Sequence, residues 1–176
     1  KEDLWGSMAH VSMLGHQNIV PPTEAAAIVG QLKKLHDIEA AGEMDFFDPK
    51  FANNDDVHMN MESRVIDAIG MEVGGKMHTT RSRNDQVPVS SKLRTRNRLL
   101  ELRELVVDAA DAFVARAREP GALEDVMPGY THFQHAQPIS VAFWWSHYAE
   151  HLSRDLRRLK ASYDITDENP LGAGAI

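Results

Sequence analysis

Residues 79–86 are the part of this chain whose side chains are best suited to chemistry. Their sequence is Thr-Thr-Arg-Ser-Arg-Asn-Asp-Gln, directly before a long helical pattern. Arg81 and Arg83 carry planar, permanently charged guanidinium forks that match carboxylates and phosphates. Ser82 and Asn84 belong to the residue types that cap helices, and the exposed N–H groups of a helix start favour an anion. The segment therefore predicts an anion-binding helix start; the alternative is an ordinary helix start with solvated arginines.

A second polar cluster occupies residues 127–138, with the sequence Met-Pro-Gly-Tyr-Thr-His-Phe-Gln-His-Ala-Gln-Pro. The imidazole of His132 can exchange a proton near neutral pH, and the Thr131 hydroxyl and Gln137 amide can orient an oxyanion. Pro128-Gly129 predicts a turn, and Gln137-Pro138 predicts an interruption of the chain before the next helix. The alternative is a polar connector whose histidine satisfies its own hydrogen bonds locally.

Composition limits the classes of protein that fit. The chain has 176 residues, of which 43% are hydrophobic and 26% charged, as in an ordinary soluble domain with a core. A net charge of −7 argues against a nucleic-acid partner, and no apolar run is long enough to span a membrane. The absence of cysteine excludes disulfides and thiol chemistry and fits a reducing compartment, so we expect a cytoplasmic protein.

Hydrophobic periodicity predicts an all-α fold with no strand. The two longest predicted helices carry apolar stripes at steps of three and four, which is typical of an up-down helical bundle. We expect an N-terminal helical region over 1–78 and part of a central bundle over 79–176. The predicted helices cover residues 4–17, 23–41, 55–69, 85–118 and 138–164, with a loop over 74–78.

Two of these helices have further sequence signals. In the first helix, the apolar residues Trp5, Met8, Val11 and Leu14 recur in steps of three and predict its buried side. The second helix follows two prolines, and Thr23 is a plausible N-cap.

Taken in order, the two clusters resemble the argininosuccinate lyase branch of the fumarase/aspartase superfamily. Further segments support the resemblance, and together they span nearly the whole chain in the family's order and spacing. The supporting segments are Leu-Trp-Gly-Ser-Met-Ala-His at 4–10, Asp-Val-His-Met-Asn-Met-Glu at 56–62, Gly-Lys-Met-His-Thr-Thr-Arg-Ser-Arg-Asn-Asp-Gln-Val at 75–87, Pro-Gly-Tyr-Thr-His at 128–132 through Pro138, and Asn-Pro-Leu-Gly-Ala-Gly-Ala at 169–175.

The resemblance implies a reaction that eliminates arginine from argininosuccinate and leaves fumarate, with no metal and no cofactor. A proton is removed beside a carboxylate, and the negative charge that spreads onto this carboxylate needs preorganised donors. The implied catalytic residues are His132 and Thr131. The implied substrate-binding residues are Ser7, His58, Arg81, Ser82, Arg83, Asn84 and Gln137.

The sequence differs from the family pattern at two residues and lacks one of the family's signatures. Thr80 and His135 stand where the family usually has glycine and arginine. A third family signature, a Gly-Ser-Ser loop followed by Met-Pro-Gln-Lys-x-Asn-Pro, does not occur in the 176 residues. That loop supplies the serine favoured as general base, so we expect this chain alone to be inactive or weakly active. The family assembles each site from three subunits of a homotetramer, which implies a homo-oligomer here.

Three alternatives remain open on the sequence. His147-Tyr148-Ala149-Glu150-His151 matches an inverted zinc-protease pattern, although a third ligand is expected farther along the chain than it extends. Another lyase of the superfamily, such as an adenylosuccinate lyase, an aspartase or a fumarase, would act on a different substrate. A non-catalytic helical oligomer, comparable to the lens crystallins of this superfamily, would show no turnover.

Overall fold

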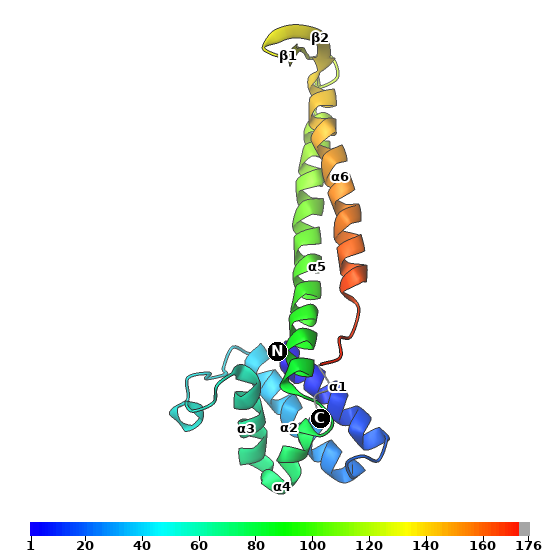
Figure 1. Cartoon of the computed structure of the whole chain (residues 1–176). Coiled ribbons are helices and arrows are strands. Elements are labelled where there is room, and N and C mark those ends of the chain that lie inside the picture. Colours follow the sequence, from blue (N-terminus) through cyan, green and yellow to red (C-terminus); the bar gives the residue numbers. More distant parts are fainter. Residues whose placement is uncertain (173–176) are drawn as a thin grey trace. The chain divides into compact units, whose positions relative to one another are not determined.

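The chain folds into two compact units (Figure 1). The computed structural model describes residues 1–172, so the predicted motif residues Ala173-Gly174-Ala175 lie outside the described part. Unit 1 consists of Lys1–Arg94 and the segment that begins at Asn169, and unit 2 consists of Thr95–Glu168. One long helix, α5 (Arg83–Ala117), contributes residues to both units. The predicted division at residues 78 and 79 stays a prediction.

Unit 1 is built from short helices. The predicted first three helices are present with ends shifted by one or two residues, whereas the predicted loop over 74–78 is helical. Its helical elements are α1 (Glu2–His16), α2 (Pro22–Ala40), the 3₁₀ turn η1 (Pro49–Phe51), α3 (Val57–Ile69), α4 (Met71–Gly74), the 3₁₀ turn η2 (Gly75–His78) and the first part of α5.

The core of unit 1 lies mainly between α1, α2 and α3. Leu14, Ile28 and Leu32 are completely buried there. Gly15 permits close packing of α1 on α2, because a Cβ at this position would lie 2.7 Å from the Cβ of Ala25. The predicted stripe of α1 needs one correction. Trp5 is 58% exposed, and Leu4 is buried in its place, which puts the buried face at steps of three and four.

The helix ends follow from local chemistry. Pro21 is the N-cap of α2 and Pro22 its first residue, so the prediction that Thr23 caps this helix is wrong. Asp56 caps α3, since its Oδ1 accepts a hydrogen bond of 2.6 Å from the Met59 N–H. Gly70 ends α3 as predicted, with a φ of 83° that favours glycine.

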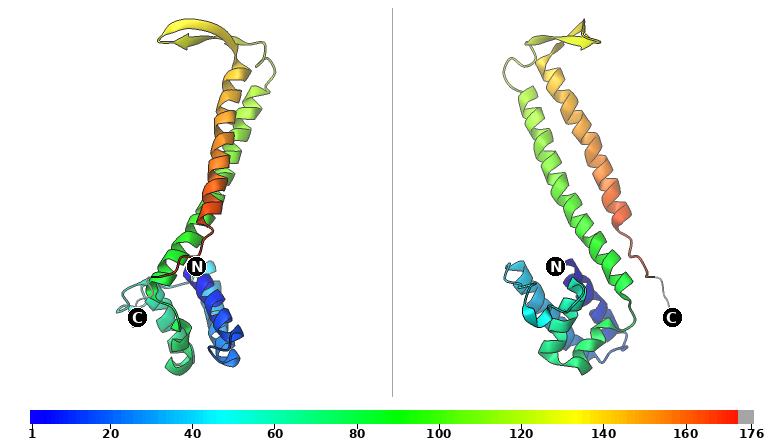
Figure 2. Two further views of the ribbon diagram at one scale, coloured as in Figure 1. Left: turned by 45° about the vertical axis from the view of Figure 1, so that its right-hand side comes forward. Right: turned by 60° about the vertical axis from the view of Figure 1, so that its left-hand side comes forward.

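Unit 2 contains the rest of α5, the strands β1 (Val126–Thr131) and β2 (Gln134–Ser140), and α6 (Val141–Thr166), as Figure 2 also shows. The prediction of a chain without strands is therefore wrong over residues 126–140, where β1 and β2 pair antiparallel. Pro128-Gly129 lies inside β1 at a register shift and is not the turn. The two-residue turn is His132-Phe133, and both residues have positive φ, 47° and 62°.

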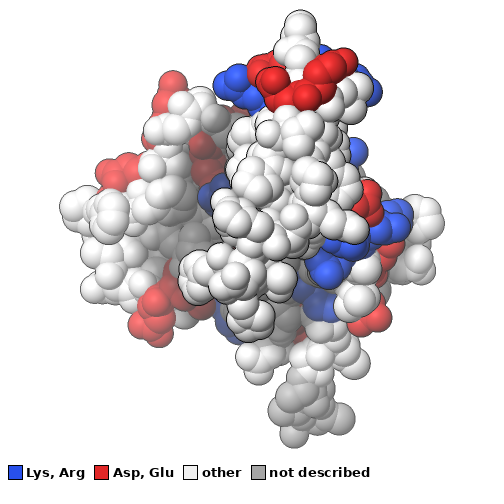
Figure 3. All heavy atoms as spheres, turned by 90° about the horizontal axis from the view of Figure 1, so that it is seen from above, with Lys and Arg blue, Asp and Glu red and all other residues white. Residues whose placement is uncertain are grey.

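Unit 2 buries few side chains. Among its residues only Ala122 and Ala142 are buried. Aromatic side chains of α5 and α6 meet instead at the surface: the ring centroid of Phe113 lies 5.7 Å from that of Trp145 and 5.4 Å from that of Tyr148. No Lys, Arg, Asp or Glu occurs between Asp125 and Glu150, and uncharged atoms dominate the view onto the hairpin (Figure 3).

No helix within residues 1–172 combines the length and the apolar content that a membrane span requires.

Candidate functional site

The arginine segment begins with a strained residue. Thr80 has a φ of 64°, in the left-handed region that glycine adopts easily and a β-branched residue avoids. Thr79 before it has an ordinary φ of −53°. Thr80 separates η2 from Arg81 and Ser82, and α5 starts at Arg83. The glycine expected from the resemblance would thus fit the observed backbone better than the threonine that is present.

Arg81 is held inside unit 1. Its Nη2 donates a hydrogen bond of 3.0 Å to Oγ of Ser7, which is 1% exposed. Its Nε is buried and makes no hydrogen bond to any residue that the structure describes. Burial lowers the pKa of the Arg81 guanidinium, while the charges of Asp3 and Glu62 act in the opposite direction. The structure thus brings Ser7 and Arg81 together, as expected for two residues of one site.

Arg83 lies between two carboxylates. Its Nε is 3.4 Å from Oδ2 of Asp56, and its Nη2 is 3.4 Å from Oε2 of Glu62. Its Nη1 donates a hydrogen bond of 2.6 Å to Oε1 of Gln86. These contacts fix the orientation of the guanidinium plane before any substrate binds. A preoriented guanidinium can recognise a carboxylate with little loss of side-chain entropy.

The start of α5 is capped by an acid. The Asp85 carboxylate accepts a hydrogen bond of 2.6 Å from the Ser82 N–H and another from the Gly172 N–H. These bonds lower the pKa of Asp85, the Ser82 bond most strongly. Asn84 and Ser82 are exposed beside it. Because Asp85 already occupies the Ser82 N–H, an incoming anion would have to use the side chains of this segment rather than that backbone group.

Two histidines flank the arginine segment. The His10 Nε2 lies 2.9 Å from the Thr79 carbonyl oxygen, a distance at which an Nε2–H donates a hydrogen bond. The His78 Nδ1 lies 3.7 Å from Oε2 of Glu62. Burial lowers the pKa of both imidazoles, against the Thr79 bond at His10 and the Glu62 charge at His78. Both rings are therefore mainly neutral at neutral pH.

The other predicted site residues belong to the hairpin of unit 2. Thr131 ends β1, His132 is the first residue of the turn, and Gln137 lies in β2. All three side chains are exposed. The turn is unusual because neither central residue is Gly, Asn or Asp, and Phe133 is 98% exposed. Strained backbone of this kind is often found where function fixes a side chain.

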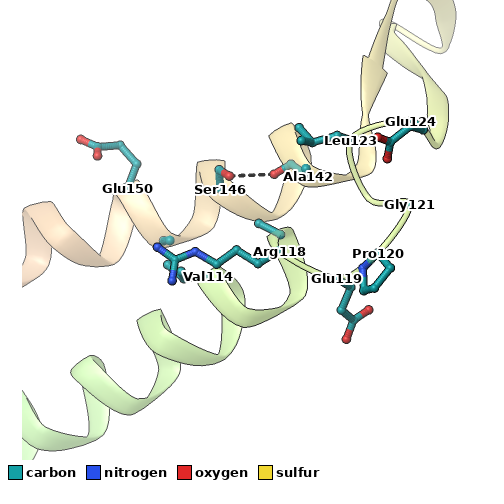
Figure 4. A pocket seen from close by; sticks show the side chains of 12 residues that line it. Val114, Arg118, Glu119, Pro120, Gly121, Leu123, Glu124, Ala142, Ser146 and Glu150 are labelled. Carbon is teal, nitrogen blue, oxygen red and sulfur yellow. Dashed lines mark hydrogen bonds between the residues drawn. The ribbon is translucent and has the colours of Figure 1, made fainter.

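Unit 2 also has a hollow that contains none of the predicted site residues (Figure 4). It measures about 790 Å³ and lies where α5 ends and α6 begins. Arg118, Glu119 and Glu150 are among its lining residues, and Ser146 donates to the Ala142 carbonyl. In the described part of the chain, no group of three His, Asp or Glu side chains is placed to hold a metal ion. The rings of His147 and His151 instead pack on each other, with centroids 4.2 Å apart.

The structure thus gathers six predicted residues in unit 1 and three in unit 2. The unit 1 set is Ser7, His58, Arg81, Ser82, Arg83 and Asn84, and the unit 2 set is Thr131, His132 and Gln137. Sequence reasoning missed the acids and the amide that hold this set, namely Asp3, Glu62 and Gln86. A signal for Asp3 exists, because a spacing of four residues puts it on the same face of α1 as Ser7.

Comparison with known proteins supports a family assignment. The argininosuccinate lyase of Limosilactobacillus fermentum is 43% identical over 175 residues, which cover 99% of this chain and 36% of the relative. Argininosuccinate lyase 2 of Shouchella clausii is 44% identical, with 100% and 37% covered. Among solved structures, EDDS lyase in complex with formate is 30% identical with a TM-score of 0.78, and 98% of this chain and 33% of that chain are covered.

The chain therefore spans little more than a third of the length of these curated relatives. The family described as Lyase matches residues 1–176, the entire sequence. The full-length match, the close relatives and the shared fold agree with one another, and this chain belongs to the lyase family.

Proposed function

We propose that this chain forms part of an argininosuccinate lyase, which eliminates argininosuccinate to arginine and fumarate. The observation that carries the proposal is the arginine segment: Arg81 is anchored on Ser7, and Arg83 is preoriented between Glu62 and Asp56. Relatives named argininosuccinate lyase match the chain from end to end. The small-molecule substrate has carboxylates, which two fixed guanidinium groups suit.

In this proposal the segment stabilises the charge that develops on a substrate carboxylate. Arg81, Arg83 and Asn84 supply positive charge and hydrogen-bond donors, and Ser82 adds a hydroxyl. A fixed donor is worth more than a mobile one because no reorganisation is needed when the negative charge appears. Ser7 and His58 line the same region from α1 and α3.

Thr131 and His132 have the proton-transfer role, and Gln137 supports binding. Their exposure on the hairpin supports the proposal, because a group that must reach a substrate has to be accessible. The strained turn at His132-Phe133 holds the imidazole at the end of the hairpin. The base that removes the substrate proton is expected from the third signature of the family, which is not within these 176 residues.

A hybrid enzyme tests the proposal. Residues 1–176 replace the matching segment of the Limosilactobacillus fermentum enzyme, and fumarate release is followed by ultraviolet absorbance. We expect the folded hybrid to cleave argininosuccinate and the 176-residue chain alone to release no fumarate. Adenylosuccinate and aspartate serve as competing substrates. A folded hybrid that cleaves one of these but not argininosuccinate would overturn the assignment.

Within the hybrid, Arg83→Lys tests the role of the guanidinium fork. Lysine keeps the charge but loses the planar geometry, so we expect kcat to fall by roughly 10² to 10³. Arg94→Lys is the matched control, because Arg94 lies in the same helix with its side chain 51% exposed and pairs with Glu2 at 3.6 Å. Equal kcat values for the two variants would contradict the proposed role of Arg83.

We also propose a homotetramer, in which unit 2 is the part that associates. The exposed apolar side chains of α5 and α6 support this, among them Leu105 at 66% and Phe143 at 62% exposure. Sedimentation of the hybrid should give four subunits, and Leu105→Glu should shift the population to smaller species. A monomeric hybrid with full activity would rule out this assembly. The cytoplasmic location stays a prediction, which cell fractionation would test.

A further inference from the structure

Asp3 is a carboxylate that the proposed mechanism does not use. It lies in the first turn of α1 and is 8% exposed. A buried carboxylate is unfavourable unless charged or hydrogen-bonding partners compensate for the lost hydration. Its partners therefore indicate what it does.

The partners of Asp3 come from two other helices. Its Oδ1 lies 2.8 Å from Nδ1 of His58 in α3. The same oxygen accepts a hydrogen bond of 3.2 Å from Nε2 of Gln86 in α5. Within residues 1–172, Oδ2 is buried without a hydrogen bond. The His58 ring is buried as well, at 7% exposure, so the pair is shielded from water.

The short contact favours one tautomer of His58. Nδ1 and the Asp3 Oδ1 are 2.8 Å apart, although Nδ1 makes no regular hydrogen bond among the described residues. An unprotonated Nδ1 would place its lone pair 2.8 Å from a carboxylate oxygen, which is repulsive at any angle. A hydrogen on Nδ1 relieves this repulsion, and in that neutral tautomer Nε2 is the nitrogen that accepts from another group.

We propose that Asp3 is a positioning residue that fixes the tautomer and ring orientation of His58 so that Nε2 faces the substrate. The inference rests on the proposed function, in which His58 lines the substrate site. Gln86 links Asp3 to Arg83: its side-chain N–H donates to Asp3, and its side-chain carbonyl oxygen accepts from Arg83. One connected set of bonds thus orients both His58 and the Arg83 guanidinium.

The first test reads the tautomer directly and needs no turnover. Long-range ¹H–¹⁵N NMR of the histidine-labelled 176-residue chain separates protonated from unprotonated ring nitrogens, and His58→Gln assigns the signals. We expect a proton on Nδ1 of His58. A proton on Nε2 alone would overturn the proposal. Because this measurement is made on the unsubstituted chain, it decides even if the hybrid enzyme proves inactive and the proposed function fails.

The second test uses the hybrid enzyme. Asp3→Asn keeps the shape but removes the charge, so we expect kcat to fall by about 10² with KM much less affected. Asp37→Asn is the matched control, since Asp37 is an exposed neighbour of His36 at 3.5 Å. In a His58→Gln background, Asp3→Asn should have no further effect on kcat. Additive effects, or an Asp3→Asn enzyme with unchanged kcat, would show that Asp3 does not act through His58.

Discussion

Leu32 in α2 is fully buried, whereas Leu105 in α5 leaves most of its side chain exposed, and this contrast extends through the two units. In its described part, unit 1 has a continuous core of eleven buried apolar residues drawn from several helices. Unit 2 arranges its apolar and aromatic side chains in surface rows along α5 and α6. Apolar stripes on helices can therefore serve either a self-contained core, as in unit 1, or a surface that requires a partner, as in unit 2.

The polar residues follow the same division. In unit 1 Ser7 holds the guanidinium of Arg81, and Asp56, Glu62 and Gln86 hold that of Arg83. In unit 2 the polar side chains of the hairpin are exposed. Unit 1 thus holds these two guanidinium groups in fixed orientations, whereas unit 2 leaves its uncharged polar side chains accessible.

The largest expected difference in stability is between substitutions of Leu32 and Leu105. Leu32→Ala should lower the free energy of unfolding of unit 1 by about 2–5 kcal/mol, because it leaves a cavity in the core. Leu105→Ala should change stability by no more than about 0.5 kcal/mol at low protein concentration. Urea unfolding monitored by circular dichroism measures both. Equal losses of unfolding free energy under these conditions would contradict the difference between the two units. A loss for Leu105→Ala that appears only at high protein concentration would support it.

Two glycines of unit 1 should change its stability in opposite directions when they are replaced by alanine. Gly15→Ala should destabilise the unit by about 1–3 kcal/mol, because the new methyl group would be forced against Ala25. Gly30→Ala should stabilise it by about 0.5–1 kcal/mol, since Gly30 lies inside α2 with no atom within 4 Å of the added Cβ. Thermal unfolding would show shifts of opposite sign. A loss of stability in both variants would mean that the surface around Gly30 is not open.

Thr80 offers a smaller test at the arginine segment. Thr80→Gly should stabilise unit 1 by up to about 1 kcal/mol, because it relieves a left-handed β-branched residue. Thr79→Gly is the control and should destabilise by about 0.5–1 kcal/mol, since Thr79 has an ordinary φ and glycine would only add freedom to the unfolded chain. If both substitutions destabilise equally, the strain assigned to Thr80 is absent.

The pH dependence of unit 1 should be the smallest effect. Burial lowers the folded-state pKa of His10 and His78, so the unfolded chain binds more protons and stability rises with pH. Their contribution is complete above the unfolded pKa of about 6.5 and is lost as pH falls below it. Melting temperatures between about pH 8 and pH 5.5 measure this slope. His10→Asn should flatten it, whereas His16→Asn, at the exposed end of α1, should leave it unchanged.

Much of the fold could be predicted from the sequence, because helix periodicity and Gly or Pro signals are local. The α5 and α6 stripes and the stop at Gly70 are examples. The hairpin could not be predicted in the same way. Its turn uses His132-Phe133 in place of the usual Asn-Gly, and the Pro128-Gly129 signal marks a bulge within a strand.

The candidate site could also be predicted only in part from the sequence. Arg81 and Arg83 stood out by residue type and spacing. Their partners did not, since the contact of Arg81 with Ser7 joins residues 74 positions apart and that of Gln86 with Asp3 joins residues 83 positions apart. Contacts of this range depend on how α1 packs on the start of α5, which no local pattern specifies. Trp5 illustrates the same limit, because the step of three placed it on the buried side of α1, whereas Leu4 is the residue that is buried.

The bond between Gly172 and Asp85 has a consequence for the order in which the protein is made. This hydrogen bond joins residues 87 positions apart, so every residue between them, including all of unit 2, is synthesised before Gly172. At a ribosome rate of about 5–20 residues per second, Gly172 follows Asp85 by roughly 4–17 s. During that interval the nascent arginine segment has only the Ser82 half of its cap, so the start of α5 is completed after the rest of its unit.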